Sequence, residues 1–469
     1  MKVEKRTVYD ILILLLVSGS VMLFGLGKGS LTSWDESIYA HISRIILESG
    51  DWVALRMGHE PWFDKPPLYM WVTAVFYRIF GINEFSARLL SVLSGMGTVL
   101  LVFLAGRNLF SRRAGFISAL ILLSTYHFIW FARMGSLDMT FTFLCMLSAV
   151  CFYLAGEKQI FITGFFVFFG LAFLTKGCGA VLIPLLILPY VLSGRKYRQL
   201  SVKYVIIGIV LFIVIVSSWY LPSYLRYGGV FLEEHFMKHV LDRSVRGLGE
   251  HEGSFLVYFN AILYKGKPWG IFGLVLFPLF IYRSVRERKE ANYLVISWIS
   301  VIIVFFSIVR TKLHWYIMPV YPALSLVAGW GIEKFLRGYS KILVIAVAVP
   351  SLVYFGTAKG LFSPDYNPDI KYFSQEVSRV RMENSVSGVL PRVYNYRVGD
   401  PGILYYLGGF SEYVHYEKEL RKVIDKGVIV VARFDQIKHL PVRWTRLNAG
   451  WRDVGVYRVS GDSDQGTAE

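Results

Sequence analysis

The chain has 469 residues, of which 55% are hydrophobic and only 18% are charged. This composition is too apolar for a typical soluble protein and is typical of a membrane protein. The formal net charge of +17 would suit a nucleic-acid partner. However, the basic residues lie in short clusters between apolar runs, which favours a role in membrane orientation and argues against nucleic acid.

Apolar runs of membrane-spanning length recur along the chain as far as residue 356. A helix needs about 20 apolar residues to cross a hydrocarbon core of about 30 Å, and on this basis we expect about eleven transmembrane helices. They lie near residues 11–26, 89–104, 114–131, 138–156, 160–174, 178–193, 205–221, 256–282, 292–309, 314–333 and 341–356. No small-residue cleavage site follows the first run, so we interpret it as a retained anchor.

Five basic clusters predict the orientation of these helices. They lie at residues 2–6, 107–113, 195–203, 283–289 and 334–341. With the N-terminus inside, all five fall on the cytoplasmic side, as the positive-inside rule requires. The outward segments are then residues 28–86, 132–138, 175–179, 222–256, 310–315 and everything after 357.

The unusual charged motifs gather on this predicted outer side. The first outward segment carries Asp35-Glu36 and Asp64-Lys65, the latter followed by two prolines. The later outward segments carry Asp138, Lys176, Arg243, His251, Lys312 and Tyr316. Ionisable residues beside a bilayer are costly and are treated as functional by default. Their collection on one face is what an active site at a membrane surface requires.

Two stretches on that side are expected to have structure of their own. Apolar residues recur at helical spacing within residues 37–47, which predicts a helix in the membrane interface with Asp35 at its start. Residues 357–469 follow the membrane domain of residues 1–356 and predict a small extracytoplasmic α/β domain. Its strands are expected at 392–396, 428–432 and 451–459, and a helix at 418–426. We interpret this domain as a lid or docking platform with a disordered tail from residue 460.

At these motifs the chain resembles the membrane glycosyltransferases that take a sugar from a polyprenyl phosphate carrier. It is most similar to the bacterial lipid A aminoarabinose transferases, and more distantly to the protein O-mannosyltransferases. The matching stretches are Asp35-Glu36-x-x-Tyr39-Ala40, Phe63-Asp64-Lys65-Pro66-Pro67-Leu68, Ala132-Arg133-x4-Asp138, Leu174-Thr175-Lys176-Gly177, Phe236-x2-His239-x3-Arg243 and Thr311-Lys312-Leu313-x2-Tyr316-x2-Pro319. They cover most of residues 30–330 in the order of that family.

The resemblance implies a polytopic α-helical membrane fold of the GT-C type, with the active site in a cavity at the outer face. It implies that Asp35 is the essential carboxylate, that Lys65 contacts the carrier phosphate and that Asp138 supports the site. Lys176 and Tyr316 are also expected to face that phosphate. The remaining candidates for substrate or phosphate binding are Glu36, Arg243 and Lys312.

Three departures from the family pattern leave the donor sugar and the acceptor open. Ile38 stands where the aminoarabinose transferases usually carry Arg, and Asp64 stands where they usually carry Glu. The chain is also short for that group. The reaction class is unaffected by these differences.

A metal ion is the one possible cofactor that the pattern raises, although none is required. In the resembled family a zinc can link the acid before Lys-Pro-Pro to a histidine of the fourth outward segment, here Asp64 and His251. Such an ion would be structural. His235 and His239 also have metal-ligand spacing at i and i+4, but phosphate binding or interface packing is the alternative for them.

Each candidate residue also has a purely structural explanation. Asp35 could cap the helix that follows it, and Asp138 could mark a helix start. The lysines at 65, 176 and 312 could snorkel to the interface. Tyr316 could belong to an aromatic belt.

We therefore expect an inverting glycosyltransferase of the bacterial inner membrane that moves a sugar from undecaprenyl phosphate, or a similar carrier, to lipid A or another envelope glycolipid. The lysines would stabilise the charge that grows on the departing phosphate. Asp35 would act as base or would orient the acceptor. Protein O-glycosylation is the alternative reaction, and a lipid or sugar transporter is the alternative class. A transporter places ionisable groups near the midplane and often has inverted repeats, and the sequence shows neither. A non-catalytic scaffold, the last alternative, would tolerate the loss of Asp35.

Overall fold

The computed structural model describes residues 5–32, 34–58, 60–193, 200–242, 254, 256–358, 360, 365–366, 368–385, 390–408, 411–424 and 428–460. The chain divides into two compact units. Unit 1 comprises residues 1–27, 52–54 and 63–363, and unit 2 comprises residues 28–51, 55–62 and 364–469. The predicted site residues Arg243 and His251 and the tail after residue 460 lie outside the described residues.

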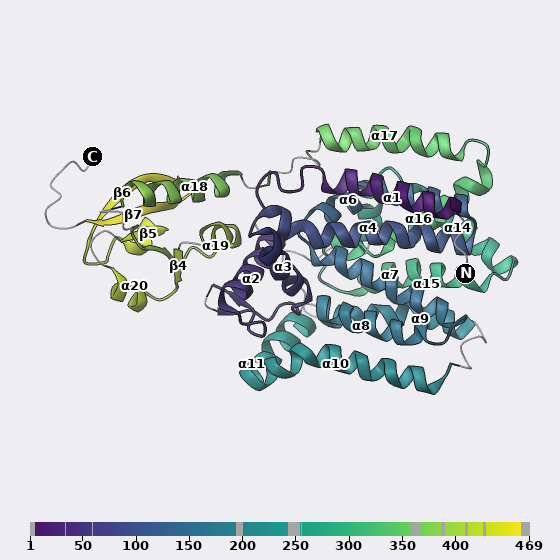
Figure 1. Cartoon of the computed structure of the whole chain (residues 1–469), viewed down its shortest axis with the longest axis horizontal. Helices are drawn as coiled ribbons and strands as arrows, with labels where there is room; N and C mark the ends of the chain where they lie inside the picture. The colour runs from purple at the N-terminus through teal and green to yellow at the C-terminus, as the bar shows by residue number, and fades with distance from the viewer. Residues whose placement is uncertain are drawn as a thin grey trace. The chain divides into compact units, whose positions relative to one another are not determined.

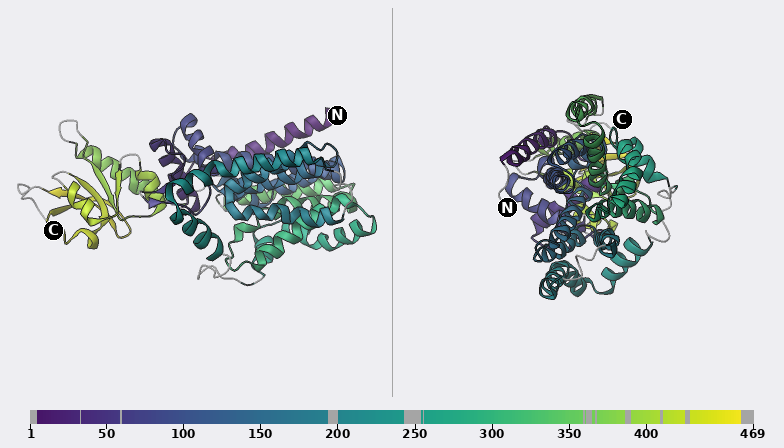
Figure 2. Two further views of the ribbon diagram at one scale, coloured as in Figure 1. Left: turned by 90° about the horizontal axis from the view of Figure 1, so that it is seen from below. Right: turned by 90° about the vertical axis from the view of Figure 1, so that its right-hand side faces the viewer.

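Unit 1 is a bundle of α-helices, the longest of which run beside one another, and the right-hand view of Figure 2 looks along them (Figures 1 and 2). Its main helices are α1 (Lys5–Leu23), α3 (Leu68–Phe80), α4 (Glu84–Leu109), α5 (Arg112–Leu123), α6 (Tyr126–Arg133), α7 (Leu137–Ala155), α8 (Phe161–Lys176), α9 (Leu182–Ser193), α10 (Val202–Tyr227), α13 (Val257–Tyr264), α14 (Gly270–Arg286), α15 (Glu290–Ile308), α16 (Val320–Phe335) and α17 (Ser340–Ala358). Shorter helical pieces are η1 (Gly177–Val181), α11 (Gly229–Leu232), the π-helical η3 (Glu233–Asp242) and η5 (His314–Ile317).

Several of these helices have membrane-spanning length. Within the described residues, seven helical stretches are long and apolar enough to cross a membrane, or eight if α5 and α6, which meet at a 66° bend, form one span. Two shorter apolar helices cover Leu68–Phe80 and Ile342–Thr357. The predicted membrane class is therefore confirmed. The expected total of about eleven spans stays a prediction.

Glycines let three of the helices pack closely. A Cβ atom at Gly115 of α5 would lie 2.4 Å from the backbone oxygen of Phe103 in α4, and one at Gly329 of α16 would lie 2.1 Å from Ser118 Oγ in α5. Real Cβ atoms do not approach so closely, so α4, α5 and α16 touch through their backbones. Small residues at helix interfaces are the usual means of close packing in membrane proteins.

Two buried arginines close the C-terminal end of α1. Arg133 donates hydrogen bonds to the carbonyl oxygens of Val21, Met22 and Phe24, each at 2.8 Å. Arg88 donates to the carbonyl oxygen of Leu26 at 2.9 Å. The last carbonyls of a helix have no intrahelical partner and carry partial negative charge. Arg133, part of a motif on the predicted outer side, therefore holds the end of the first helix.

Unit 2 contains a mixed five-stranded sheet in the order β4-β3-β5-β7-β6, in which β3 pairs in parallel with β4 and β5 and the other pairs are antiparallel. The strands are β3 (Val393–Tyr396), β4 (Ser411–Val414), β5 (Ile429–Arg433), β6 (Arg443–Trp451) and β7 (Val454–Ser460), and the helices are α18 (Pro368–Glu383), α19 (Pro401–Leu407), α20 (Glu417–Val423) and α21 (Phe434–Ile437). Successive residues of β3 and β5 enter two separate apolar clusters, one on each face of the sheet. Both faces of the sheet are therefore covered.

Unit 2 also takes in part of the first outward loop. This part contains α2 (Asp35–Ser49) and the short strands β1 (Arg56–Met57) and β2 (Glu60–Pro61). Ser30 donates to Asp365, Leu31 donates its backbone N–H to Tyr406, and Arg44 donates to the Tyr405 carbonyl. The predicted division at residue 357 had grouped this loop with the membrane domain, whereas these contacts tie it to the sheet-containing unit.

Candidate active site

A buried ion pair joins two of the predicted site residues in unit 1. Lys176 is the last residue of α8, and its ammonium donates to a carboxylate oxygen of Asp138 in the first turn of α7. The side chains are only 9% and 4% exposed. A cation at a helix C-terminus and an anion at a helix N-terminus both complement the helix dipoles. Ser136 caps α7 by accepting from the Asp138 backbone N–H, so Asp138 indeed lies at a helix start.

Aromatic rings surround the Lys176 ammonium. Its Nζ lies 4.6 Å from the centre of the Tyr316 ring and 5.2 Å from that of Phe141. Tyr316 comes from η5 and contacts Phe306, with ring centres 5.4 Å apart. Cation–π contacts strengthen when water is excluded. The structure therefore brings Asp138, Lys176 and Tyr316 together in an environment with little water.

The Lys-Pro-Pro element lies next to this cluster. Gly177 directly follows Lys176 and has a positive φ of 59°. A Cβ atom placed on it would lie 3.6 Å from Pro66 Cγ and 3.7 Å from His235 Nε2. The adjacent Lys65 ammonium donates to the Asp64 carboxylate at 2.7 Å, and both side chains keep partial exposure of 16% and 19%. The residues of four predicted motifs in unit 1 are thus neighbours.

His235 braces the Lys-Pro-Pro element rather than facing solvent. The side chain is buried, and its Nδ1 donates to the Phe63 carbonyl oxygen at 2.6 Å, because a carbonyl can only accept. Its Nε2 then accepts from the Tyr220 hydroxyl at 3.0 Å. The ring also stacks on Phe231, with centres 5.4 Å apart. This position corresponds to the packing alternative for His235, while the side chain of His239 lies outside the described residues.

Lys312 has a different environment from the other two lysines. Its ammonium donates to the backbone carbonyls of Ser307 and Val309, at 2.7 and 2.8 Å. These carbonyls lie at the C-terminal end of α15, where helix oxygens lack intrahelical partners. Lys312 therefore closes a helix end.

Asp35 and Glu36 belong to unit 2, where they begin α2. Trp34 occupies the N-cap position and Asp35 is the first helical residue, so Asp35 is not the cap that a simple structural explanation expected. Asp35 is half-buried, whereas Glu36 is 1% exposed and accepts from the Thr32 backbone N–H at 2.8 Å. Glu36 thus fixes the entry into α2. That Asp35 shares a site with Lys65 and Lys176 stays a prediction.

The described residues contain no group of three or more His, Cys, Asp or Glu side chains that could hold a metal ion. One carboxylate oxygen of Asp64 is engaged by the Lys65 ammonium, and His251 lies outside the described residues. Asp64 therefore forms an ion pair in this structure, and its pairing with His251 around a metal ion stays a prediction.

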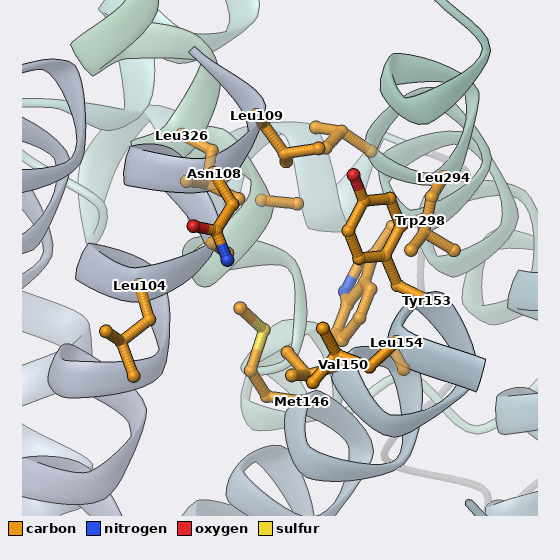
Figure 3. Close-up of a pocket in the computed structure, with 14 residues that line it drawn as sticks. Leu104, Asn108, Leu109, Met146, Val150, Tyr153, Leu154, Leu294, Trp298 and Leu326 are labelled. Carbon is orange, nitrogen blue, oxygen red and sulfur yellow. The ribbon is translucent and has the colours of Figure 1, made fainter. Parts of the chain in front are cut away.

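An apolar pocket lies elsewhere in unit 1, between α4, α7, α15 and α16 (Figure 3). Its lining from α7 runs from Met146 to Leu154. Asp138 lies eight residues before Met146, or about 12 Å along the helix axis at 1.5 Å per residue. The pocket is therefore separate from the Asp138–Lys176 cluster.

Several known proteins are similar to this chain in sequence. Residues 64–220 match the family model described as dolichyl-phosphate-mannose-protein mannosyltransferase. An uncharacterized protein of Aquifex aeolicus is 30% identical over 335 residues, which are 71% of this chain and 76% of that protein. The undecaprenyl phosphate-α-4-amino-4-deoxy-L-arabinose arabinosyl transferase 2 of Pseudomonas fluorescens is 28% identical over 376 residues, or 75% of this chain and 66% of that enzyme.

A solved structure has the same fold over nearly the whole chain. The crystal structure of ArnT from Cupriavidus metallidurans bound to undecaprenyl phosphate gives a TM-score of 0.77 at 23% identity and covers 97% of this chain and 99% of that one. In sequence, the chain spans between 55% and 66% of the length of the P. fluorescens aminoarabinose transferases. The sequence similarity and the shared fold agree, and the chain belongs to one family with this A. aeolicus protein and with the aminoarabinose transferases named above.

Proposed function

We propose that this protein is an inverting glycosyltransferase that moves a sugar from a polyprenyl phosphate carrier to lipid A, or to another envelope glycolipid, at the outer leaflet of the bacterial inner membrane. The names of its relatives support the donor class, because they specify undecaprenyl phosphate-linked aminoarabinose. The observation that carries the proposal is the buried Lys176 ammonium, which lies between Asp138 and Tyr316 and beside the Lys65 element.

The proposed reaction is a single displacement at the anomeric carbon. An acceptor oxygen forms a bond to this carbon, the carbon–oxygen bond to the carrier phosphate breaks, and its electron pair stays on the phosphate. Preformed cations in a site of low dielectric stabilise such developing charge most effectively. Lys65 and Lys176 would supply that charge, and Asp138 would hold Lys176 in place. Lys312 is a weaker candidate because helix carbonyls occupy its ammonium.

Asp35 would receive the proton of an acceptor hydroxyl, or would orient an acceptor phosphate whose own oxygen attacks. Its position supports this role, because it is half-buried in the first turn of α2 and does not occupy the N-cap. Glu36 would act indirectly by fixing the start of α2. Arg243 remains a proposed phosphate contact, and Asp64 with His251 a proposed structural metal pair.

We also propose that the chain crosses the membrane about eleven times, at the apolar runs of about 20 residues in the sequence, and that its N-terminus lies in the cytoplasm. The active site and residues 357–469 would then face the periplasm, where the latter would serve as a lid or docking platform. The five basic clusters between helices support this orientation. Accessibility labelling of single cysteines at exposed loop positions on each predicted side would test it.

The decisive experiment compares cells carrying the wild-type protein, Asp35→Asn and Lys65→Ala by mass spectrometry of lipid A and of carrier-linked sugars. We expect one sugar to disappear from lipid A in both variants while its carrier-linked donor accumulates. The mass difference would identify the sugar. Unchanged lipid A and donor pools in variants that reach the membrane in normal amounts would refute the glycolipid acceptor.

A protein acceptor is the second candidate, and the match of residues 64–220 to the protein mannosyltransferase family favours it. The two candidates share the donor and differ only in the acceptor. Mass spectrometry of periplasmic proteins from the same strains would separate them. Loss of a protein-linked sugar with unchanged lipid A would replace the first candidate with the second.

A further inference from the structure

Two histidines and a tyrosine form a hydrogen-bonded chain in unit 1 that none of the six motifs predicts. His127 of α6 bonds through Nδ1 to the Tyr321 hydroxyl of α16 at 2.7 Å, and through Nε2 to Nδ1 of His314 in η5 at 3.0 Å. His127 and Tyr321 are buried, whereas His314 is partly exposed. The chain therefore runs from the core of the bundle toward a more accessible end at His314.

The direction of the hydrogen bonds follows from counting acceptors. The Tyr321 hydroxyl has His127 as its hydrogen-bond partner, and no second one is found among the described residues. Its proton must therefore point to His127 Nδ1, because a buried hydroxyl proton without an acceptor is costly. Neutral His127 then carries its proton on Nε2 and donates it to His314 Nδ1. His314 is left with its proton on Nε2, as a donor at the accessible end.

Lys265 adds a positive charge to the same place. The backbone carbonyls of Lys265 and Lys267 accept from the N–H groups of His127 and Tyr126, which fixes this loop against the start of α6. Lys265 therefore lies next to His127, the residue that bonds to His314. Within the described part of the chain, Lys265 is partly buried and has no ion pair. A partly buried cation without a counter-charge is unusual, because buried charges are normally paired.

This cluster lies on a different side of η5 from the Lys176 site. His314 contacts His127 and Phe131 of α6, whereas Tyr316 faces Lys176 and Phe306. One short helix therefore separates two cationic places. Each place presents hydrogen-bond donors and an ammonium. The carboxylate of Asp138 pairs with the ammonium of the Lys176 site and not with Lys265.

We propose that Lys265 and the Nε2–H of His314 form a second anion-binding subsite, which takes a phosphate group of the acceptor glycolipid while the carrier phosphate occupies the Lys65 and Lys176 site. An ammonium and a fixed N–H donor together match a phosphate, which accepts several charge-assisted hydrogen bonds. His127 and Tyr321 are positioning residues, because they fix which nitrogen of His314 carries the proton. The acceptor assignment rests on the proposed transferase function.

Steady-state kinetics of the full-length protein in nanodiscs would test the subsite with two acceptors: lipid A that keeps both phosphates (the phosphorylated acceptor) and lipid A that has lost one of them (the dephosphorylated acceptor). Lys265→Met should raise the KM for the phosphorylated acceptor about tenfold or more. It should leave kcat, the donor KM and the KM for the dephosphorylated acceptor nearly unchanged. Tyr321→Phe should shift the same constant in the same direction by a smaller factor. Lys267→Met is the matched control, because Lys267 is exposed and its ammonium lies over the Tyr264 ring, 5.4 Å from its centre.

Equal KM increases for both acceptors would overturn the subsite, since the phosphate would then not be what Lys265 recognises. Equilibrium binding without donor provides a readout that does not need turnover, with phosphorylated lipid A and inorganic phosphate as separate probes. Binding of lipid A that depends on Lys265 but leads to no transfer would support the subsite and refute the proposed reaction. Binding of inorganic phosphate alone, with lipid A excluded, would overturn the acceptor assignment.

Discussion

The lysines of the six motifs have unequal surroundings, and their surroundings decide what each can do. Lys176 is buried between a carboxylate and aromatic rings, Lys65 pairs with its partly exposed neighbour Asp64, and Lys312 donates to helix carbonyls. From sequence alone the three had equal standing. Lys65 and Lys312 bond to residues within five positions of them in the chain. Only the partners of Lys176 are distant in the chain, so no local pattern could reveal its burial in an ion pair.

The Asp138–Lys176 pair should be required for both folding and activity. Removing one partner of a buried ion pair leaves an uncompensated charge and costs about 3–5 kcal/mol. We expect Asp138→Asn and Lys176→Met each to lower the thermal unfolding temperature in detergent and to abolish transfer. The double variant should regain most of the stability while remaining inactive. Recovery of transfer in the double variant would show that the pair is structural only.

Lys312 should behave in the opposite way. Its ammonium donates to two carbonyls at the end of α15, and a hydrogen bond from a charged group contributes about 1.5–3 kcal/mol at most when it is partly exposed. Lys312→Met should therefore lower the unfolding temperature slightly and reduce kcat by only a few-fold. Lys65→Met, measured in parallel, should lose far more activity. A loss of a hundredfold or more in Lys312→Met with normal stability would instead place Lys312 at the phosphate.

At the scale of elements, several helices and strands could be predicted from the spacing of their hydrophobic residues, but the bends within apolar runs could not. Strands β3, β5 and β7 and helices α2 and α20 lie where alternation and helical spacing predicted them. The bend between α5 and α6 falls inside one apolar run, because Ser124 and Thr125 bond back to carbonyls of the preceding turn. Helix α18 and strand β6 were missed. The apolar residues of α18 at 370, 373, 377 and 380 do recur at helical spacing, whereas residues 443–451 show no regular alternation.

The contact between α4 and α5 depends on Gly115, a feature that sequence patterns did not single out. A side chain there would meet backbone atoms of α4 at 2.4 and 2.6 Å, and backbone cannot move aside as a flexible side chain can. Gly115→Ala should therefore separate the two helices and destabilise unit 1 by about 1–3 kcal/mol or more, as overpacking does. Gly338→Ala is the control, because no atom lies within 4 Å of its added Cβ. Equal unfolding temperatures for the two variants would contradict this packing.

At the scale of the whole molecule, the sequence predicted the membrane class but not the composition of the two units, and the outer-face location of the motifs stays a prediction. The loop before residue 63 lies between two apolar runs of the sequence, and for this reason it was predicted to belong to the membrane domain. In the structure, α2 packs on α19 and its Arg44 bonds the Tyr405 carbonyl. Long-range pairing of this kind carries no periodic signal. The residue proposed as the base, Asp35, therefore belongs to a unit whose core is formed some 350 residues later.

His41 lies in α2, within unit 2, and we expect it to make the stability of this unit sensitive to acid. Burial lowers the pKa of His41 from 6.5 to about 4, helped by the charge of Arg44 and opposed by the Leu404 backbone. The Gly58 N–H donates to His41 Nε2, so protonation removes an acceptor as well as burying a charge. The unfolded histidine takes up its proton near pH 6.5. The free energy of unfolding therefore decreases as the pH falls from 6.5 toward 4, by about 3 kcal/mol at most.

Hydrogen exchange of the buried strand β5 in the full-length protein would measure this dependence. Exchange should be slowest above pH 6.5, after correction for the intrinsic rate, and protection should fall steadily toward pH 4. His41→Gln removes the titrating group, so its protection should be lower at neutral pH but nearly flat across this range. If wild type and His41→Gln lost protection in parallel, another group would be responsible. If protection fell with pH in the wild type only, the stability of the sheet would depend on His41. The folding of α2, which carries Asp35, would then be coupled to the folding of the sheet.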